Sequence, residues 1–291
     1  METARLAKPI SGEKLYQKRA RQALPLLVRQ VRAVQSIYYS DLAHELGMRN
    51  PRNLNYVLGY IGTTIEDLSK SWGERIPPIQ CLVVNKTTRL PGAGVGRFIT
   101  GGNFRELPRR QQRMLVDEME QQVFLYSKWD GVLAALKLSP IPTDFSRLVA
   151  QAAAFRSTGE SEDHKYLKLY VAGHPESVGL DSNMAKGKIE YLLPSGDALD
   201  VFFQDKKDWI GIEVKSSLSN DSDITRGLFQ CVKYRAVIEA VQASQGLDQN
   251  ARVILVLEST LPEELIGLKN ILGIEIVDKV VPDSPGLPKP E

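Results

Sequence analysis

The sequence predicts two domains, an N-terminal domain made mainly of α-helices and an α/β C-terminal domain with a mixed central sheet. Three observations carry this prediction. With 291 residues, 43% of them hydrophobic, the chain is long enough for two hydrophobic cores. The first half shows helical spacing of apolar residues, whereas the second half reads as helix, three strands, helix and strand. Between the halves lies SPIPTDF, residues 139–145, whose prolines oppose a continuing helix.

The domain boundaries follow from these patterns. We place the N-terminal domain with its helical extension at 1–138, a linker at 139–154 and the C-terminal domain at 155–281. The proline-rich tail 282–291 is predicted to be mobile.

Composition excludes several classes of protein. No apolar run approaches the roughly 20 residues that cross a bilayer, and the opening METARLAKPISGEK lacks the apolar core of a secretory signal. We therefore expect a cytoplasmic protein with no membrane partner. The chain has only two cysteines and three scattered histidines, so it predicts neither a disulfide framework nor a zinc site.

The N-terminal half opens with helical spacing over 13–35, followed by two shorter helices. Ser40 would cap a helix that ends at the next glycine. Asn50 followed by Pro51 is a second start signal, with asparagine as the cap and proline in the first turn, for a helix to about Tyr60. Two helices joined by a tight turn predict a helix-turn-helix.

The start of the second helix is the predicted contact with duplex DNA, because this end of a recognition helix usually enters the major groove. Residues 1–60 also carry ten Lys and Arg against four acidic residues, a balance that favours a phosphate backbone. A helical subdomain that binds protein or only packs is the alternative. The candidate DNA-contacting residues are Arg49, Arg52, Asn53, Asn55 and Tyr56.

The next segment, IPPIQCLVVNKTTRLPGAGVGRF, predicts a strand over 79–84, a turn and a glycine-rich return, as in a β-wing. Residues 20–98 therefore resemble a winged-helix domain. More narrowly they are similar to the DNA-binding part of the alkylguanine-DNA alkyltransferases, with a matching YYSDLAHELG helix and a VV strand before a glycine turn. The Pro-Cys-His-Arg motif of that family is absent, since Cys81 lies in IQCLVV. The resemblance implies DNA binding without alkyl transfer.

The rest of the chain supplies the remaining elements. Helices are predicted over 106–137, 147–173, 224–243 and 262–270, and strands over 188–193, 198–203, 209–216, 252–257 and 273–277.

The strand WIGIEVKSS, residues 209–217, carries two opposite charges. Its isoleucines and valine point to one face, so Glu213 and Lys215 share the other face, about 7 Å apart along the strand. An isolated ion pair stabilises a core poorly, because desolvation can exceed the Coulomb attraction. The pair therefore indicates a chemical role.

The preceding strand, in SGDALDVFF, supplies a partner. Alternation places Asp200 on the face opposite Leu199, Val201 and Phe203, and a hairpin through QDKKD would bring Asp200 beside Glu213. Two converging carboxylates suit Mg²⁺ or Mn²⁺. A metal that polarises a phosphate, beside a lysine that stabilises the attacking hydroxide, predicts hydrolysis of a phosphodiester.

Asp200, a spacer of twelve residues, and then Glu213-Val214-Lys215 at the end of an apolar strand resemble the PD-(D/E)xK nuclease superfamily, whose fold is the restriction-endonuclease-like α/β core. The resemblance covers about 155–278 and lacks the proline of the motif. It implies an acidic metal or water ligand on the preceding helix, for which GESEDHKYLK offers Glu162, with Glu160 as the second choice.

The superfamily also implies a glutamine and a tyrosine one turn apart on the following helix, here Gln230 and Tyr234. Gln230 would then lie near the active site, and Tyr234 near the substrate or in the core. For Glu162, the helix dipole is an equal explanation. His164 and His174 are expected at the surface or as capping residues.

Together these resemblances imply a Mg²⁺-dependent endonuclease, with Mn²⁺ as a substitute, that cuts double-stranded DNA in restriction, phage defence or repair. A homodimer or a partner subunit would complete such a system. One alternative is a DNA-binding or assembly protein with a catalytically silent nuclease fold, and another is an RNA substrate. The candidate metal ligands are Asp200, Glu213 and Glu162, and the further catalytic residues are Lys215 and Gln230.

Overall fold

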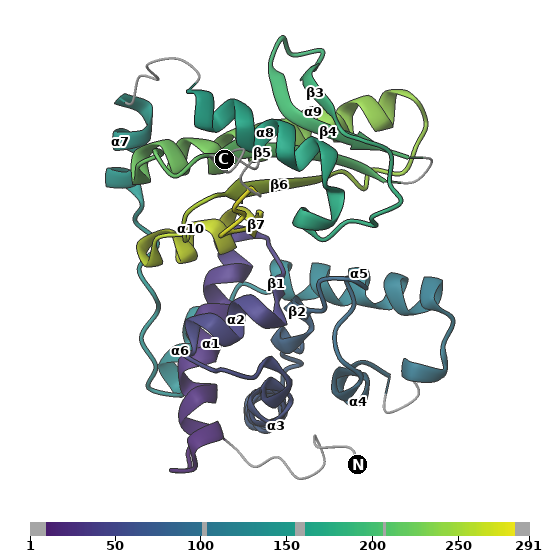
Figure 1. Cartoon of the computed structure of the whole chain (residues 1–291). Coiled ribbons are helices and arrows are strands. Elements are labelled where there is room, and N and C mark those ends of the chain that lie inside the picture. The colour runs from purple at the N-terminus through teal and green to yellow at the C-terminus, as the bar shows by residue number, and fades with distance from the viewer. Residues whose placement is uncertain (1–9, 101–103, 155–160, 206–207, 283–291) are drawn as a thin grey trace, which may run out of the picture. The chain divides into compact units, whose positions relative to one another are not determined.

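A computed structural model describes residues 10–100, 104–154, 161–205 and 208–282. The chain divides into two compact units, Met1–Thr143 and Asp144–Glu291 (Figure 1). The division falls inside the predicted linker. The second part of that linker forms a helix, α7 (Ser146–Ala154), which packs against the long helix α9 (Asp221–Ser244). The tail from residue 283 onward lies outside the described residues.

Unit 1 is mainly helical, as predicted. One core joins the buried faces of its helices with a short stretch after α3. The α-helices are α1 (Leu15–Ala33), α2 (Tyr39–Glu45), α3 (Leu54–Trp72), α4 (Gly96–Thr100), α5 (Arg109–Leu125) and α6 (Trp129–Ala135). Short 3₁₀ turns span Pro51–Asn53, Ile79–Leu82, Ala93–Val95 and Phe104–Glu106, and the strands are β1 (Ile37–Tyr38) and β2 (Val83–Val84).

The two helix starts of the predicted helix-turn-helix differ in outcome. Asn50 caps the 3₁₀ turn Pro51–Asn53 that leads directly into α3, because its side chain accepts a hydrogen bond from the amide of Arg52 at 3.0 Å. The prediction for Ser40 is wrong: the cap of α2 is Tyr38, two residues earlier, and Ser40 lies inside the first turn of the helix. The second helix also extends past Tyr60, since the buried apolar spacing continues until Gly73 takes up the left-handed conformation at φ 62°.

The predicted β-wing is not formed. Residues 79–82 make a 3₁₀ turn with all four side chains buried, which leaves only Val83–Val84 as a strand. This strand pairs in parallel with β1, and the return segment touches it at a single bridge between Val84 and Pro91. A run that is buried on all sides carries no alternation that would mark it as extended. The predicted helix 106–137 is also broken, into α5 and α6.

Unit 2 holds a mixed five-stranded sheet in the order β3-β4-β5-β6-β7. The first two pairings are antiparallel and the last two are parallel. The strands are β3 (Lys188–Leu192), β4 (Ala198–Gln204), β5 (Trp209–Lys215), β6 (Arg252–Leu257) and β7 (Glu275–Val277). Each lies within three residues of its predicted bounds, so the α/β prediction for this half is confirmed.

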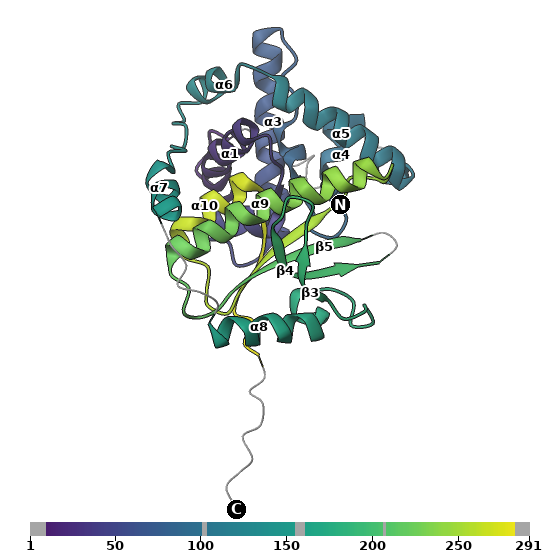
Figure 2. The same cartoon turned by 90° about the horizontal axis from the view of Figure 1, so that it is seen from above.

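Helices cover both faces of this sheet. Figure 2 shows α9 and α8 (Glu162–Gly173) on opposite sides of the strands. One core lies between the sheet and α9 with α10 (Glu263–Leu272), and a second core lies between the sheet and α8. The predicted helix 147–173 is two helices, α7 and α8, separated by residues outside the described part of the chain. No helix in the described residues is long and apolar enough to cross a membrane.

Candidate active site

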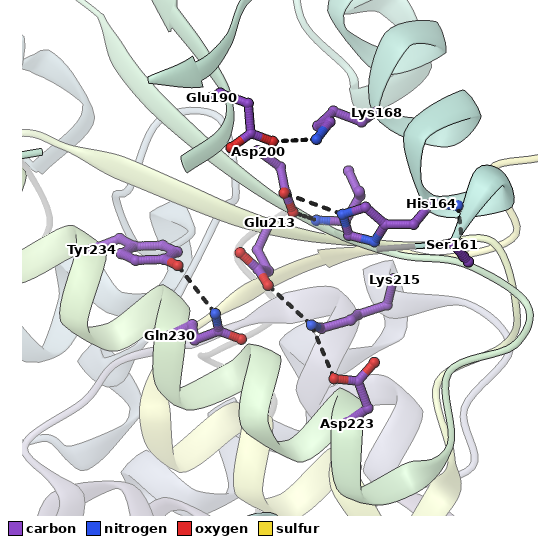
Figure 3. A network of polar contacts seen from close by, with 11 residues as sticks. Ser161, His164, Lys168, Glu190, Asp200, Glu213, Lys215, Asp223, Gln230 and Tyr234 are labelled. Atoms are coloured by element: carbon purple, nitrogen blue, oxygen red, sulfur yellow. Dashed lines mark hydrogen bonds and ion pairs between the residues drawn. The ribbon is translucent and has the colours of Figure 1, made fainter. Parts of the chain in front are cut away.

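The candidate site lies where β4 and β5 part. On β5, Ile210, Ile212 and Val214 enter the core on the α8 side of the sheet, so Glu213 and Lys215 point to the α9 side. Both charges are buried, with 4% of Glu213 and 7% of Lys215 exposed. The ammonium group of Lys215 lies 3.0 Å from a carboxylate oxygen of Glu213. The arrangement predicted for these two residues is therefore present (Figure 3).

Asp200 lies beside them at the end of the β4–β5 ladder. The last backbone pair of this antiparallel register joins Val201 to Ile212, and continuing the register would place Asp200 opposite Glu213. The side chain of Asp200 replaces a backbone carbonyl as the acceptor at this point: its Oδ2 accepts a hydrogen bond from the backbone amide of Val214 at 2.8 Å. The carboxyl groups of Asp200 and Glu213 stand next to each other in Figure 3.

The predicted side-chain alternation of β4 is wrong around Asp200. Leu199 packs on the α9 side of the sheet and Val201 on the α8 side, although the sequence placed both on one face. The ladder to β3 has the same irregularity, because Ile189 pairs with Val201 and Tyr191 with Leu199 while the position between them is not paired. There Glu190 adopts a left-handed φ of 50°. This local break frees the carboxylate of Asp200 to reach β5.

His164 approaches the site from α8, contrary to its prediction as a surface or capping residue. Its Nε2 lies 3.2 Å from Oδ1 of Asp200, and only 19% of the side chain is exposed. Ser161 caps the start of this helix, because its hydroxyl accepts a hydrogen bond from the backbone amide of His164 at 3.1 Å. Burial lowers the pKa of His164, but the hydrogen bond and charge of Asp200 outweigh it, so the pKa is raised overall.

A second residue that the sequence did not reveal is Asp223, in the first turn of α9. Its Oδ1 lies 3.1 Å from the ammonium group of Lys215. Burial lowers the pKa of Lys215, yet the two carboxylates of Glu213 and Asp223 outweigh it and raise the pKa. Lys215 therefore carries its positive charge in a buried position.

The carboxyl group of Glu213 behaves differently. Burial first, and then the negative charge of Asp200, raise its pKa to about 8, although Lys215 acts in the opposite direction. Two carboxylates that repel one another in a buried site are stabilised by a proton or by a cation.

Gln230 and Tyr234 line the site from α9. The amide nitrogen of Gln230 donates a hydrogen bond to the hydroxyl of Tyr234 at 3.1 Å. The amide oxygen of Gln230 is buried without a hydrogen-bond partner among the described residues. An oxygen of this kind accepts readily from a bound water or ligand. Tyr234 itself is a buried core residue.

Glu162 is not part of this arrangement. Its side chain is 88% exposed and forms an ion pair with Lys165 at 2.7 Å, one turn along α8. The helix brings His164 to Asp200 instead. Glu160, the second choice, lies outside the described residues.

The residues predicted to contact DNA gather around the start of α3 in unit 1. Arg49, Arg52 and Asn55 are exposed, and Asn53 is partly buried. Tyr56 is 41% exposed, and its ring stacks on Tyr16 of α1 with the ring centroids 5.0 Å apart.

The donor set of the candidate site fits a hard divalent cation. Among the described residues, no three His, Cys, Asp or Glu side chains are arranged to hold a metal ion. Mg²⁺ is commonly held by one or two carboxylates, with water and substrate phosphate completing its octahedron. Asp200 and Glu213 supply two such carboxylates. Each oxygen that already accepts one hydrogen bond retains a second lone pair.

Comparison with known proteins gives no relative: no family model, no curated protein and no solved structure matches this chain.

Proposed function

We propose that this protein is a metal-dependent endonuclease that hydrolyses phosphodiester bonds in double-stranded DNA, and that unit 2 has the restriction-endonuclease-like fold. The observation that carries the proposal is the gathering of the buried Glu213 and Lys215 with the partly buried Asp200 at the point where two core strands separate. A core gains little from three such charges, because their desolvation opposes their attraction. Perturbed ionisable groups in one place are instead typical of catalytic sites.

The residues have distinct roles in the proposed reaction. Asp200 and Glu213 would hold Mg²⁺, or Mn²⁺ in its place. A bound ion of this kind polarises the phosphate and lowers the pKa of a water molecule. Lys215 donates a hydrogen bond to the attacking oxygen and stabilises the negative charge that develops on the phosphate. One bond forms between this oxygen and phosphorus, the ester bond breaks, and the leaving oxygen takes a proton from water.

His164 and Gln230 support this chemistry without entering it. With one oxygen of Asp200 held by the amide of Val214 and the other by His164, the carboxylate keeps a single orientation. Hydrogen bonds that orient a metal-binding carboxylate in this way are commonly needed for full affinity. The amide oxygen of Gln230 offers an acceptor for a bound water.

Unit 1 would bring the DNA to the site. The basic and amide side chains at the start of α3 suit phosphate contacts and base contacts respectively. This part of the proposal rests on the exposure of Arg49, Arg52 and Asn55 at one helix end.

The test is cleavage of supercoiled plasmid by the purified protein with Mg²⁺, with Mn²⁺ and with EDTA. We expect nicked and linear products that require the metal and that disappear in Asp200→Ala and in Lys215→Ala. The matched controls are Asp197→Ala and Lys233→Ala, which break an ion pair of 2.7 Å in unit 2 between the turn before β4 and α9. Intact plasmid with both metals would refute the proposal.

A second function is favoured by one observation. Because Glu162 points to solvent, the described residues of α8 supply no acidic metal ligand beside Asp200 and Glu213. Such an incomplete set of acidic ligands is expected of a DNA-binding or assembly protein whose nuclease fold is catalytically silent. The same protein would then shift DNA in a gel while leaving the plasmid intact.

A further inference from the structure

We propose that Asp223 is the positioning residue for Lys215 in the hydrolysis proposed above, on which this assignment rests. The ammonium group of Lys215 contacts two carboxylates, Glu213 at 3.0 Å and Asp223 at 3.1 Å. The side chain of Asp223 is 17% exposed, so the contact is largely shielded from water. Figure 3 shows it approaching from α9, on the side of Lys215 away from Asp200.

The local structure of α9 is fitted to this contact. Asn220 caps the helix, because its side chain accepts a hydrogen bond from the backbone amide of Asp223 at 3.0 Å. This bond fixes Asp223 in the first turn. One turn later stands Gly227. A Cβ at that position would lie 2.9 Å from Cε of Lys215, so a larger residue would push the end of the lysine side chain out of its present place.

The consequence for Lys215 is orientation. An ammonium group has three N–H donors in a fixed tetrahedral arrangement. When two of them are directed at Glu213 and Asp223, the direction of the third is fixed as well. No other protein acceptor contacts this group among the described residues. The third donor is therefore held ready for the attacking water or for a phosphate oxygen.

Removal of Asp223 would change the state of Glu213 too. Lys215 would then have Glu213 as its one carboxylate partner and would bond to it more closely. The ammonium group of Lys215 would no longer be held in one orientation. The carboxylate of Glu213, a proposed metal ligand, would be drawn away from the metal. Both effects lower the rate of the chemical step and leave DNA binding unchanged.

A purely structural role makes a different prediction. Acidic residues in a first helical turn stabilise the helix through its dipole, and Asp221 occupies the same turn of α9. Asp221 is exposed, whereas Asp223 is the residue of this turn that contacts Lys215. Asp221→Asn therefore removes the same dipole interaction as Asp223→Asn, and only the second variant loses the contact with Lys215.

The experiment compares these two variants in the full chain by two measurements. The first is single-turnover cleavage of a duplex at saturating protein, with the dissociation constant for the duplex measured in Ca²⁺. We expect Asp223→Asn to lower the rate about 10- to 100-fold, the range typical of residues that orient a site, with an unchanged dissociation constant. Asp221→Asn should stay within about twofold of the natural protein.

The second measurement is acylation of Lys215 by acetic anhydride in protein free of metal and DNA, followed by mass spectrometry. Lys215 should react several-fold faster in Asp223→Asn than in Asp221→Asn, at equal thermal stability. Equal reactivity in both variants would overturn the proposal, as would a changed reactivity with an unchanged cleavage rate. If the natural protein cleaves nothing, the proposed function fails, and the acylation result still decides whether Asp223 holds Lys215.

Discussion

Asp200 accepts a hydrogen bond from the backbone amide of Val214 at 2.8 Å, beyond Val201 and Ile212, the last backbone pair between β4 and β5. A side chain thus completes the antiparallel ladder at the point where its strands separate. This contact places a carboxylate next to Glu213 and leaves its other oxygen facing His164.

Substitution of His164 should weaken metal binding through Asp200. We expect His164→Ala to reduce Mg²⁺ affinity about 10- to 100-fold, because an orienting hydrogen bond to a metal-binding carboxylate is lost. Isothermal titration calorimetry with Mg²⁺ measures this directly. The control is His174→Ala at the other end of α8, where the ring stacks on Tyr170 away from the site. Equal affinities in the two variants would contradict the role given to His164.

Glu213→Gln should abolish cleavage and yet stabilise the metal-free protein. The folded-state pKa of Glu213 is raised to about 8, above its unfolded value. Its charged form therefore opposes folding, and this penalty grows as the pH rises from about 4.5 toward 8. Glutamine has the same shape without the charge. The gain in the free energy of unfolding should be on the order of 4 kcal/mol near pH 8, because each unit of pKa shift corresponds to about 1.4 kcal/mol.

Urea unfolding in EDTA at pH 5 and pH 8 provides the measurement. At pH 5 both the natural protein and the variant carry a neutral side chain in the folded state, so their stabilities should nearly agree. A variant that is less stable than the natural protein at pH 8 would show that the charged form of Glu213 is favoured in the fold.

Arg52→Ala should weaken DNA binding in a salt-dependent way. Each lost phosphate contact lowers the slope of log K against log salt by about one. Fluorescence anisotropy with a labelled duplex at several salt concentrations gives this slope. Lys70→Ala is the matched control, because Lys70 is an exposed cation near the other end of the same helix, α3. A slope unchanged in Arg52→Ala would remove this helix end from the DNA interface.

Unit 1 contains a buried ion pair whose loss should be costly. Arg29 of α1 is 4% exposed and donates two hydrogen bonds to Glu45 of α2, at 2.6 and 2.7 Å. Glu45→Ala leaves a buried guanidinium without this partner, which costs about 3–5 kcal/mol of stability. Chemical unfolding should detect this loss. Asp130→Ala breaks the exposed pair with Arg32 and should cost no more than about 1 kcal/mol.

The sequence predicted unit 2 more successfully than unit 1, for a physical reason. The central strands β4, β5 and β6 are mostly apolar and are bounded by turn residues, so their bounds follow from the local pattern. In unit 1 the apolar run 79–84 is buried on all sides, and such a run does not distinguish a strand from a 3₁₀ turn. The cap at Asn50 was predictable because asparagine followed by proline is a strong local signal.

The candidate site was partly predictable for a similar reason. Glu213 and Lys215 share a face by simple alternation, and a hairpin brings Asp200 near them. Alternation failed at Asp200 itself, because the ladder breaks there and the side chain replaces a backbone partner. His164 and Asp223 reach the site from helices on either side of the sheet, and such tertiary contacts leave no periodic signal in a single sequence.

The most direct test of the hydrolytic site is the single-turnover cleavage rate of Lys215→Met on a duplex that is fully bound in Mg²⁺. Methionine keeps the length and the apolar packing of the side chain and removes only the ammonium group. A catalytic lysine predicts a rate lower by about 100-fold or more, with duplex affinity unchanged. A rate equal to that of the natural protein would contradict the assignment of Asp200, Glu213 and Lys215 as the active site.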